Sequence, residues 1–381
     1  MRKKIYYWAP HLTKIATARA VINSAYSLKK YENNYECSII NFFGEFDGDR
    51  AELNEKKINL INFYNPLIKK LFPIYGKIKS RFSFILIFCL GFFPLKKLIL
   101  KNSPEFLIIH LITSLPLFQL IIFNYKTNFI LRISGKPRLN ILRKFFWKLA
   151  LKKIYAVSCP TKSTYEHIKK LNIVDVAKLK ILYDPILDIK NILNKKKEKI
   201  KILDNYYISV GRLTKQKNFL FLCKAFKKIL NLKKENKNLR LVIAGDGEQK
   251  ILLENFILKN KLEKNIELIG HVDNIYPLIS NANGFILSSL WEDPGFVIIE
   301  AAFCRTLVLS SNCSTGPIDL IKNDYNGILF ESNNEESFVN NFEKFKKKIN
   351  KNFLLLNNIK NVKKFTLFSH YLSLSRILKK N

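Results

Sequence analysis

Acidic residues are scarce in this sequence of 381 residues, and its cysteines and histidines are few and scattered. There are 30 Asp and Glu against 65 Lys and Arg, which gives a net charge of +35. The six cysteines form no C-x-x-C pair, and none has a histidine at metal-ligand spacing. We therefore expect free thiols in a reducing compartment and no metal site. The positive charge favours anionic partners, but a compositional bias of the source explains it equally well.

Long, uninterrupted apolar runs are also missing. Residues 82–95 carry no charge but are short and include Pro94, and residues 106–123 are interrupted by His110, Pro116 and Gln119. A membrane-spanning helix needs about 18 apolar residues or more, so we expect core or interfacial segments and no span. The basic N-terminus precedes only five apolar residues, which is too short for a signal peptide.

What the chain does contain is a regular alternation of short apolar runs with longer helical patterns, which is typical of β-α-β units in an α/β fold with parallel sheets. The length predicts two domains. The expected order is an N-terminal domain over 1–185, a linker over 186–204 and a second domain over 205–350. A helical segment over 351–381 follows, for which packing back on the first domain is one option. The expected strands lie at 5–9, 37–43, 106–111, 128–133, 154–159, 206–210, 239–244, 266–269, 284–288, 307–310 and 327–330.

A basic, aromatic insertion over 65–100 fits this alternation poorly. Apolar residues flanked by lysine and arginine suit a helix that lies on an anionic membrane surface. A crossover helix packed on the sheet is an equally good interpretation. The basic residues in question are Lys69, Lys70, Lys77, Lys79, Arg81, Lys96 and Lys97.

Three features follow predicted strands of the second half, where ligands of open α/β sheets bind. In the first, a strand ends at Gly211, and a loop carries Arg212 and Lys217 just before a helix. Glycine lets a backbone approach an anion, and two cations beside a helix N-terminus stabilise a diphosphate. Taken alone, these residues are better explained as surface cations.

The second feature is Ala-Gly-Asp-Gly-Glu at 244–248. It is similar to a phosphate loop, but Asp246 and Glu248 would repel phosphate. We therefore expect a structural turn and helix cap.

The third feature runs from the strand end at residue 288 into a helix that we expect to begin near Phe296. Glu292 lies in the loop and Glu300 about one turn into the helix, so both can face one crevice. Carboxylates accept hydrogen bonds from sugar hydroxyls, and the amides of Gly295, Phe296 and Val297 are exposed at the helix start. An acidic residue near a helix N-terminus has a purely structural explanation as well.

In combination these motifs resemble the retaining glycosyltransferases of family 4, which are group 1 glycosyl transferases of the GT-B class. The matches, in order, are Gly-Arg-Leu-x4-Asn, Ile-Ala-Gly-Asp-Gly, Leu-Ile-Gly-His-Val-x-Asn, Ser-x-Trp-Glu-x-Pro-Gly-Phe and Glu-x7-Glu, then Gly316-Pro317 before Asn326-Gly327. They cover residues 206–330; the first half matches only in outline. The resemblance implies two doubly wound Rossmann-like domains that face a cleft.

For the donor, the resemblance implies that Arg212 and Lys217 hold the diphosphate of a nucleotide-sugar. Glu300 would bind the ribose, and Glu292 with the amides of 295–297 would orient the sugar. The nucleobase would be bordered by His271 and Val272. No cofactor or metal is expected, because cationic side chains and helix ends take the place of a divalent ion.

For the acceptor, the resemblance points to the first domain. His110 follows a predicted strand where many family members place a histidine that faces the transferred sugar; a core histidine is as good an interpretation. Arg132, Lys136 and Arg138 would suit a lipid-linked pyrophosphate. The loop at 9–13 lacks the Gly-Gly pair of the family, which leaves open how the first domain approaches the donor.

The implied activity is transfer of a hexose from a UDP- or GDP-sugar to a lipid-linked or polysaccharide acceptor, in lipopolysaccharide, O-antigen or capsule synthesis. The enzyme would lie on the cytoplasmic face of the inner membrane, bound peripherally to its anionic surface. A nucleotide-sugar epimerase or hydrolase on the same scaffold is the alternative. Nucleic-acid binding is least favoured, because no zinc finger, helix-turn-helix or ribonucleoprotein motif is present.

Overall fold

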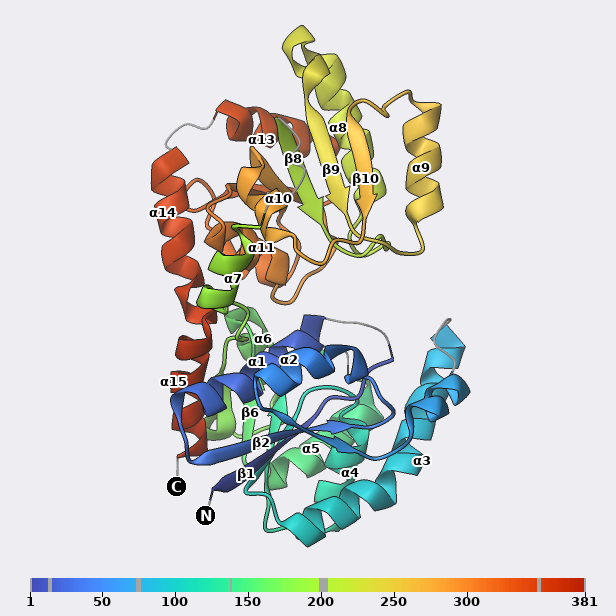
Figure 1. The fold of residues 1–381 in the computed structure, drawn as a ribbon, viewed down its shortest axis with the longest axis vertical. Helices are drawn as coiled ribbons and strands as arrows, with labels where there is room; N and C mark the ends of the chain where they lie inside the picture. Colours follow the sequence, from blue (N-terminus) through green and yellow to red (C-terminus); the bar gives the residue numbers. More distant parts are fainter. Residues whose placement is uncertain are drawn as a thin grey trace. The chain divides into compact units, whose positions relative to one another are not determined.

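The computed structural model describes residues 2–12, 16–72, 77–137, 139–198, 205–347 and 351–379 and is drawn in Figure 1. The chain divides into two compact units. Unit 1 comprises Met1–Ile186 and Leu367–Asn381, and unit 2 comprises Leu187–Thr366. The end of the chain therefore belongs to the same unit as its beginning.

Unit 1 is built on a parallel sheet with seven strands among the described residues, in the order β3-β2-β1-β4-β5-β6-β7. The strands are β1 (Lys3–Trp8), β2 (Tyr35–Asn41), β3 (Asn59–Asn62), β4 (Phe106–Ile109), β5 (Asn128–Arg132), β6 (Ala156–Cys159) and β7 (Leu179–Ile181). The edge strands β3 and β7 were not expected from the sequence. The α/β prediction with parallel sheets is confirmed.

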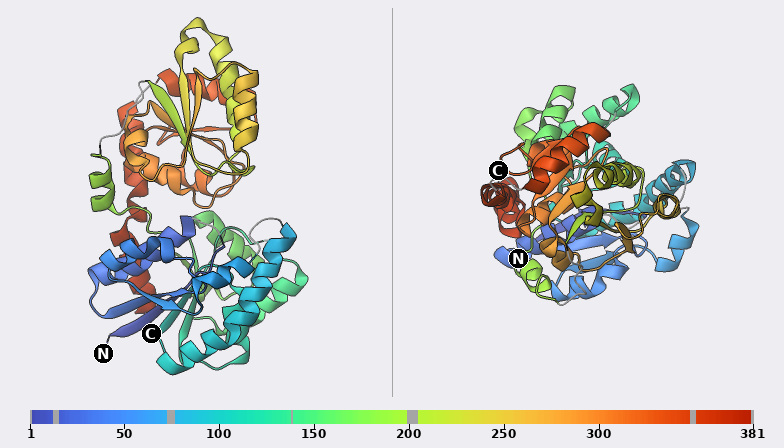
Figure 2. Two further views of the ribbon diagram at one scale, coloured as in Figure 1. Left: turned by 45° about the vertical axis from the view of Figure 1, so that its right-hand side comes forward. Right: turned by 90° about the horizontal axis from the view of Figure 1, so that it is seen from above.

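Both faces of this sheet are buried, because alternate side chains of each strand enter different cores. On β1, Ile5 and Tyr7 belong to one core, and Tyr6 and Trp8 belong to the other. The first core is covered by α1 (Ala16–Tyr31), α2 (Arg50–Glu55) and α15 (Leu367–Leu378). The second is covered by α3 (Lys77–Asn102), α4 (Ser114–Ile122), α5 (Ile141–Lys153) and α6 (Lys162–Leu171). Helices α1 and α15 lie side by side in both figures (Figures 1 and 2).

Helix α3 corrects the expectation that residues 82–95 are too short to span a membrane. The helix continues through Pro94, and its residues Arg81–Asn102 are long and apolar enough to cross a membrane by length and composition. It nevertheless packs on unit 1 with every fourth residue buried, as the crossover interpretation predicts. The buried positions are Ser83, Ile87, Gly91, Leu95 and Ile99. The side chains of Lys69, Lys70, Lys77 and Lys79 lie outside the described part of the chain.

Unit 2 contains a parallel sheet with six described strands in the order β10-β9-β8-β11-β12-β13. The strands are β8 (Tyr206–Val210), β9 (Arg240–Ala244), β10 (Ile266–Gly270), β11 (Gly284–Leu287), β12 (Val308–Ser311) and β13 (Ile328–Phe330). Its helices are α8 (Phe219–Leu232), α9 (Lys250–Lys259), α10 (Tyr276–Asn281), α11 (Phe296–Phe303), α12 (Gly316–Leu320), α13 (Glu335–Lys347) and α14 (Lys351–Val362). The segment expected to be an irregular linker contains α7 (Ile189–Lys195).

Both sheets have the same kind of switch point. The strand order reverses between β1 and β4 in unit 1 and between β8 and β11 in unit 2. In open α/β sheets the crevice beyond the carboxyl ends of the strands at such a point is the preferred ligand site. His110 follows β4 directly, Gly211 follows β8 and Ser288 follows β11, so three predicted site segments start at switch points.

Candidate functional site

The loop after β8 rests on the turn after β9. The amide of Leu213 donates to the carbonyl of Asp246 over 2.9 Å, and the amide of Gln249 donates to the carbonyl of Leu213 over 2.9 Å. A Cβ on Gly245 would lie 1.9 Å from the carbonyl oxygen of Gly211, so only glycine permits this approach. The structural turn predicted at 244–248 is confirmed, but the helix cap is not: the N-cap of α9 is Gln249, without a side-chain hydrogen bond.

Lys217 and Glu292 meet at the switch point of unit 2. The Lys217 ammonium forms an ion pair with Oε1 of Glu292, and the two side chains are only 14% and 8% exposed. The Ser289 hydroxyl donates to the same carboxylate oxygen over 2.6 Å. The Lys217 stem folds back over the bare Cα of Gly211, since a Cβ there would lie 2.9 Å from Cε of Lys217. A cation and an anion from two strand ends are thus held together away from bulk water.

Backbone and side-chain bonds fix the two loops to each other. The Leu290 amide donates to the carbonyl of Gln216 over 2.8 Å, and the Gln216 side chain donates to the carbonyl of Trp291 over 2.8 Å. The Ser288 hydroxyl donates to the carbonyl of Lys217 over 2.8 Å. These bonds preorganise the pair of charges, which is what electrostatic catalysis needs.

Helix α11 begins at Phe296, as the sequence predicts, after Gly295 in the left-handed region (φ 89°). Its first amides, those of Phe296 and Val297, have no acceptor within the helix. Glu300 is 3% exposed and accepts a hydrogen bond from the Tyr276 hydroxyl over 3.1 Å. The carboxylate is therefore buried but oriented by a hydroxyl donor.

The remaining predicted donor residues are more open. The Arg212 side chain is exposed and forms no ion pair among the residues described. His271 is exposed and lies 3.3 Å from the Asp273 carboxylate, while Val272 is half-buried. The structure thus brings Lys217 and Glu292 into contact and joins Glu300 to Tyr276.

In unit 1, His110 is a buried imidazole. It is 5% exposed, and neither ring nitrogen has a hydrogen-bond partner among the described residues; its ring lies near that of Tyr7, with centroids 5.9 Å apart. Burial, followed by the charge of Arg132, holds the pKa of His110 well below its usual range. A neutral imidazole with unused nitrogens can donate to or accept from a ligand hydroxyl.

His110 lines a cavity of about 590 Å³ within unit 1. The rest of the lining combines apolar side chains with a few polar ones, as in small-molecule sites. It includes His11, Phe84, Thr113, Ser134, Arg143 and Trp147. His11 comes from the loop that lacks Gly-Gly, and its Nδ1 lies 3.0 Å from the carbonyl oxygen of Ala9.

Arg132 corrects the expected cluster of free cations at the end of β5. Its guanidinium is buried and forms an ion pair with Asp184, with Nε donating to Oδ1 over 3.1 Å. It also donates to the Ser134 hydroxyl over 2.6 Å, which in turn donates to the carbonyl of His110 over 3.2 Å. Arg132 is therefore neutralised and supports the backbone of His110; Lys136 is exposed, and Arg138 lies outside the described residues.

Sequence reasoning missed Ser289, Tyr276, Arg143 and Trp147. Ser289 had a signal, because it stands three residues before Glu292 in the Ser-x-Trp-Glu motif. The others had none, since their positions depend on packing between distant elements.

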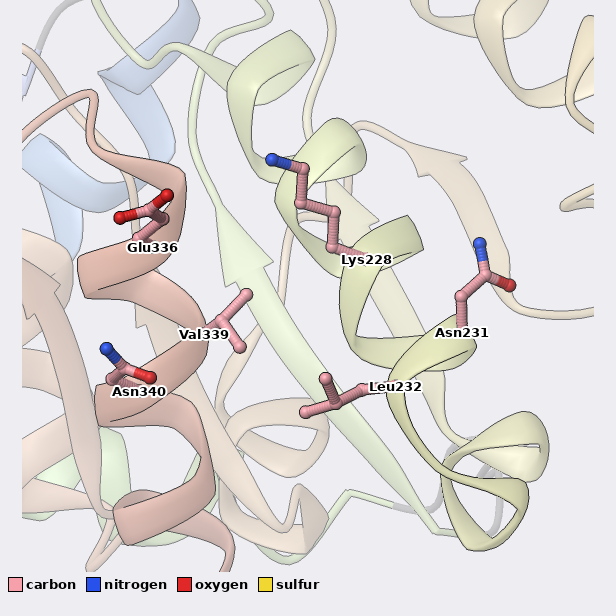
Figure 3. Close-up of a pocket in the computed structure, with 6 residues that line it drawn as sticks. All are labelled: Lys228, Asn231, Leu232, Glu336, Val339 and Asn340. Carbon is pink, nitrogen blue, oxygen red and sulfur yellow. The ribbon is translucent and has the colours of Figure 1, made fainter.

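A second hollow, of about 510 Å³, lies between α8 and α13. In Figure 3, Leu232 of α8 and Val339 of α13 face the space between the two helices. No residue that the sequence predicts for the site lines it. No cluster of three or more His, Cys, Asp or Glu with metal-binding geometry occurs in the described part of the chain.

Comparison with known proteins gives one family. Residues 191–361 match the family described as glycosyl transferases group 1. An uncharacterized glycosyltransferase of Methanocaldococcus jannaschii is 29% identical, over 77% of this chain and 73% of that protein. A UDP-Gal:alpha-D-GlcNAc-diphosphoundecaprenol alpha-1,3-galactosyltransferase of Escherichia coli is 33% identical, over 49% of this chain and 51% of that protein. The chain thus spans about half the length of this second relative.

Solved structures with a similar fold cover nearly the whole chain. A glycosyltransferase from Rickettsia africae has a TM-score of 0.76 at 17% identity, covering 99% of this chain and 98% of its own. Anabaena HepE, solved with UDP and glucose, has a TM-score of 0.72 at 14% identity, with full coverage of both chains. The prediction of two doubly wound, Rossmann-like units of the GT-B class is confirmed. The cleft expected between them stays a prediction.

Proposed function

We propose that this chain, whose second unit carries the domain of the group 1 glycosyl transferases, transfers a sugar from a nucleotide-sugar to a glycan or lipid-linked acceptor. The observation that carries the proposal is the shielded ion pair of Lys217 and Glu292 at the switch point of unit 2. An anionic leaving group and a polar sugar need opposite charges held at one place, and this pair supplies both.

The donor roles that we propose combine the family resemblance with this geometry. Lys217 and the exposed Arg212 would hold the diphosphate, so that Lys217 exchanges the Glu292 carboxylate for phosphate oxygens when the donor binds. Glu292 would then accept from sugar hydroxyls, together with the first amides of α11. Glu300, oriented by Tyr276, would take the ribose hydroxyls.

Departure of the nucleoside diphosphate leaves negative charge on its β-phosphate. Two cationic side chains and a helix N-terminus stabilise that charge without a metal, so metal independence is part of the proposal. His110, neutral and unpartnered, would meet a hydroxyl of the transferred sugar. Retention of the anomeric configuration rests on the Glu-x7-Glu resemblance.

The acceptor class is suggested by relatives. The Escherichia coli protein is named for a diphosphoundecaprenol acceptor, and a Campylobacter jejuni relative that is 30% identical over 52% of this chain is named for another. We propose a polyprenyl-diphosphate-linked glycan as acceptor, in cell-envelope glycan synthesis. The enzyme would act peripherally at the cytoplasmic face of an anionic membrane.

A thermal-shift screen of UDP- and GDP-sugars tests the donor, because ligand binding to the native state raises the melting temperature. The best donor is then incubated with a diphosphoundecaprenol-linked sugar in the presence of EDTA, and the anomeric configuration of the product is read by NMR. Transfer with retention, unaffected by EDTA, is expected. Sugar released or epimerised without acceptor would instead favour the hydrolase or epimerase alternative.

A further inference from the structure

Helix α3 has a second apolar stripe opposite the one that packs on unit 1. The exposed fractions are 54% for Phe82, 59% for Ile85, 72% for Phe93 and 58% for Leu100, and the exposed Cys89 lies between them. Spacings of three, four and seven residues place these side chains on one helix face. A helix with apolar side chains on two opposite faces is normally covered on both, yet none of the described residues of unit 1 covers this stripe.

Helix α5 exposes large apolar side chains as well. Ile141 is 87% exposed, Leu142 79% and Phe145 64%, whereas Trp147 and Leu151 of the same helix are buried in the core. Single exposed apolar residues are ordinary, but an accumulation of them marks an interaction surface.

The two helices belong to one layer. Both contact α4, and Phe84 of α3 lines the same cavity as Arg143 and Trp147 of α5. Their sequences contain no acidic residue, and neither does that of α4. Basic residues are interspersed among the apolar ones: Arg81, Lys96, Lys97, Lys101, Arg143, Lys144, Lys148, Lys152 and Lys153.

We propose that the exposed faces of α3 and α5 form one docking surface for an anionic lipid bilayer, here named the α3–α5 surface. Apolar side chains would enter the boundary between headgroups and acyl chains, and the lysines would lie among anionic headgroups. An acidic protein would complement the positive charge of these helices. It would not account for so many projecting aliphatic and aromatic side chains, which an acyl-chain layer would take up.

Docking, and not spanning, is consistent with the packing of α3. Ile87, Leu95 and Ile99 belong to the core of unit 1, and a Cβ on Gly91 would lie 2.8 Å from side-chain atoms of Leu115 and Phe42. Crossing a bilayer would remove all of these contacts and expose the sheet beneath.

The inference deepens the proposed function, because a polyprenyl-linked acceptor lies in a bilayer and the cavity beside His110 is bordered by both helices. Membrane docking of the α3–α5 surface can be tested without any sugar substrate. Binding of the full chain is measured by flotation with phosphatidylcholine vesicles, with and without phosphatidylglycerol. The thermal-shift screen on the same preparations tests donor binding separately. A failure of membrane docking can therefore be told apart from a failure of the proposed transferase function.

Two variants alter the α3–α5 surface, and a third is their control. The apolar variant is Phe93→Ser, Ile141→Ser, Leu142→Ser, and the charge variant is Lys97→Gln, Lys144→Gln, Lys148→Gln. The control changes exposed residues of α9 in unit 2: Ile251→Ser, Leu252→Ser, Leu258→Ser, which are 71%, 46% and 59% exposed. Circular dichroism confirms that each variant is folded.

The native chain and the control should float with phosphatidylglycerol vesicles and be released by salt and alkaline carbonate. Each surface variant should bind roughly tenfold more weakly or worse. Failure of the native chain to float, or equal binding by folded surface variants, would overturn the proposal. Retention after carbonate would show that α3 inserts, and a stable complex with an acidic protein in place of vesicle binding would assign the surface to that partner; either result also overturns it.

Discussion

At the scale of single residues, the main feature of unit 2 is the shielded ion pair between Lys217 and Glu292. Lys217 is held by Glu292 and by the packing of its stem over Gly211, so its ammonium group has a fixed position. Preorganised charge of this kind stabilises a transition state without reorganisation during the reaction.

Replacement of Lys217 by alanine should lower kcat by about 10²-fold or more, because the proposed role of Lys217 is to stabilise the departing diphosphate. Initial rates with the best donor measure this. Lys215→Ala is the matched control, since Lys215 lies in the same loop and is exposed. Equal activity of the two variants would contradict the role given to Lys217.

Asp184→Asn should destabilise unit 1 by about 3–5 kcal/mol, because it leaves the buried Arg132 guanidinium without a counter-charge. Denaturant unfolding followed by tryptophan fluorescence measures this, since Trp8 and Trp147 belong to the core of unit 1. Asp273→Asn, at a carboxylate that is 96% exposed, should change stability by less than about 0.5 kcal/mol. Similar curves for both variants would show that the Arg132–Asp184 pair contributes little.

At the scale of elements, the two loops of the donor site depend on close backbone contact between neighbouring turns. Gly245 lies against the Gly211 carbonyl with no room for a Cβ, so the position of the Arg212–Lys217 loop depends on the absence of a side chain at residue 245.

Gly245→Ala should therefore displace this loop and weaken donor binding in the thermal-shift assay, along with a lower melting temperature. Gly48→Ala is the control, because nothing lies within 4 Å of its Cβ position. If Gly245→Ala kept native donor affinity, the contact would be unimportant for the site.

Elements with strong local patterns could be predicted from the sequence. The strands that precede Gly211 and Ser288 are short, mostly apolar runs, and α11 begins where Pro294 and Gly295 indicate. Strands β3 and β7 could not be predicted, because each is a short, partly exposed edge strand. The length of helix α3 could not be predicted either, because packing of Leu95 and Ile99 in the core outweighs the local cost of Pro94 inside the helix.

The sequence predicted those site residues that come directly after a strand. It did not predict ion pairs and hydrogen bonds between residues that are far apart in the sequence. Arg132 looked like a free cation because Asp184, 52 residues later, has no sequence signal that connects the two. The hydrogen bond from Tyr276 to Glu300 and the burial of His110 likewise depend on tertiary packing.

At the scale of the whole molecule, two buried histidines of unit 1 make its stability depend on pH. Burial lowers the pKa of His370 to about 4 and that of His110 well below its usual range. Both are neutral in the folded state, whereas the unfolded chain takes up protons near pH 6.5. The stabilisation is complete above pH 6.5 and is lost as the pH falls toward 4.

Unfolding of unit 1, followed by tryptophan fluorescence, should accordingly become easier between pH 6.5 and 4.5, by up to about 1.4 kcal/mol per pH unit for each histidine. His370→Gln should reduce this slope, even though it also removes the hydrogen bonds to Ser24 and to the carbonyl of Tyr183. A native chain whose stability is flat over this range would contradict the assignment.

Helix α15 has a consequence for synthesis on the ribosome. Leu374, Ile377 and Leu378 complete the core beneath α1, but they emerge only after the whole of unit 2 has been made. At about 5–20 residues per second, the nascent first unit waits roughly 10 to 40 seconds with an apolar face uncovered. Such an intermediate exposes apolar surface and is expected to bind chaperones. A separately added peptide that carries α15 should restore the folding of unit 1 in a chain that ends before Leu367.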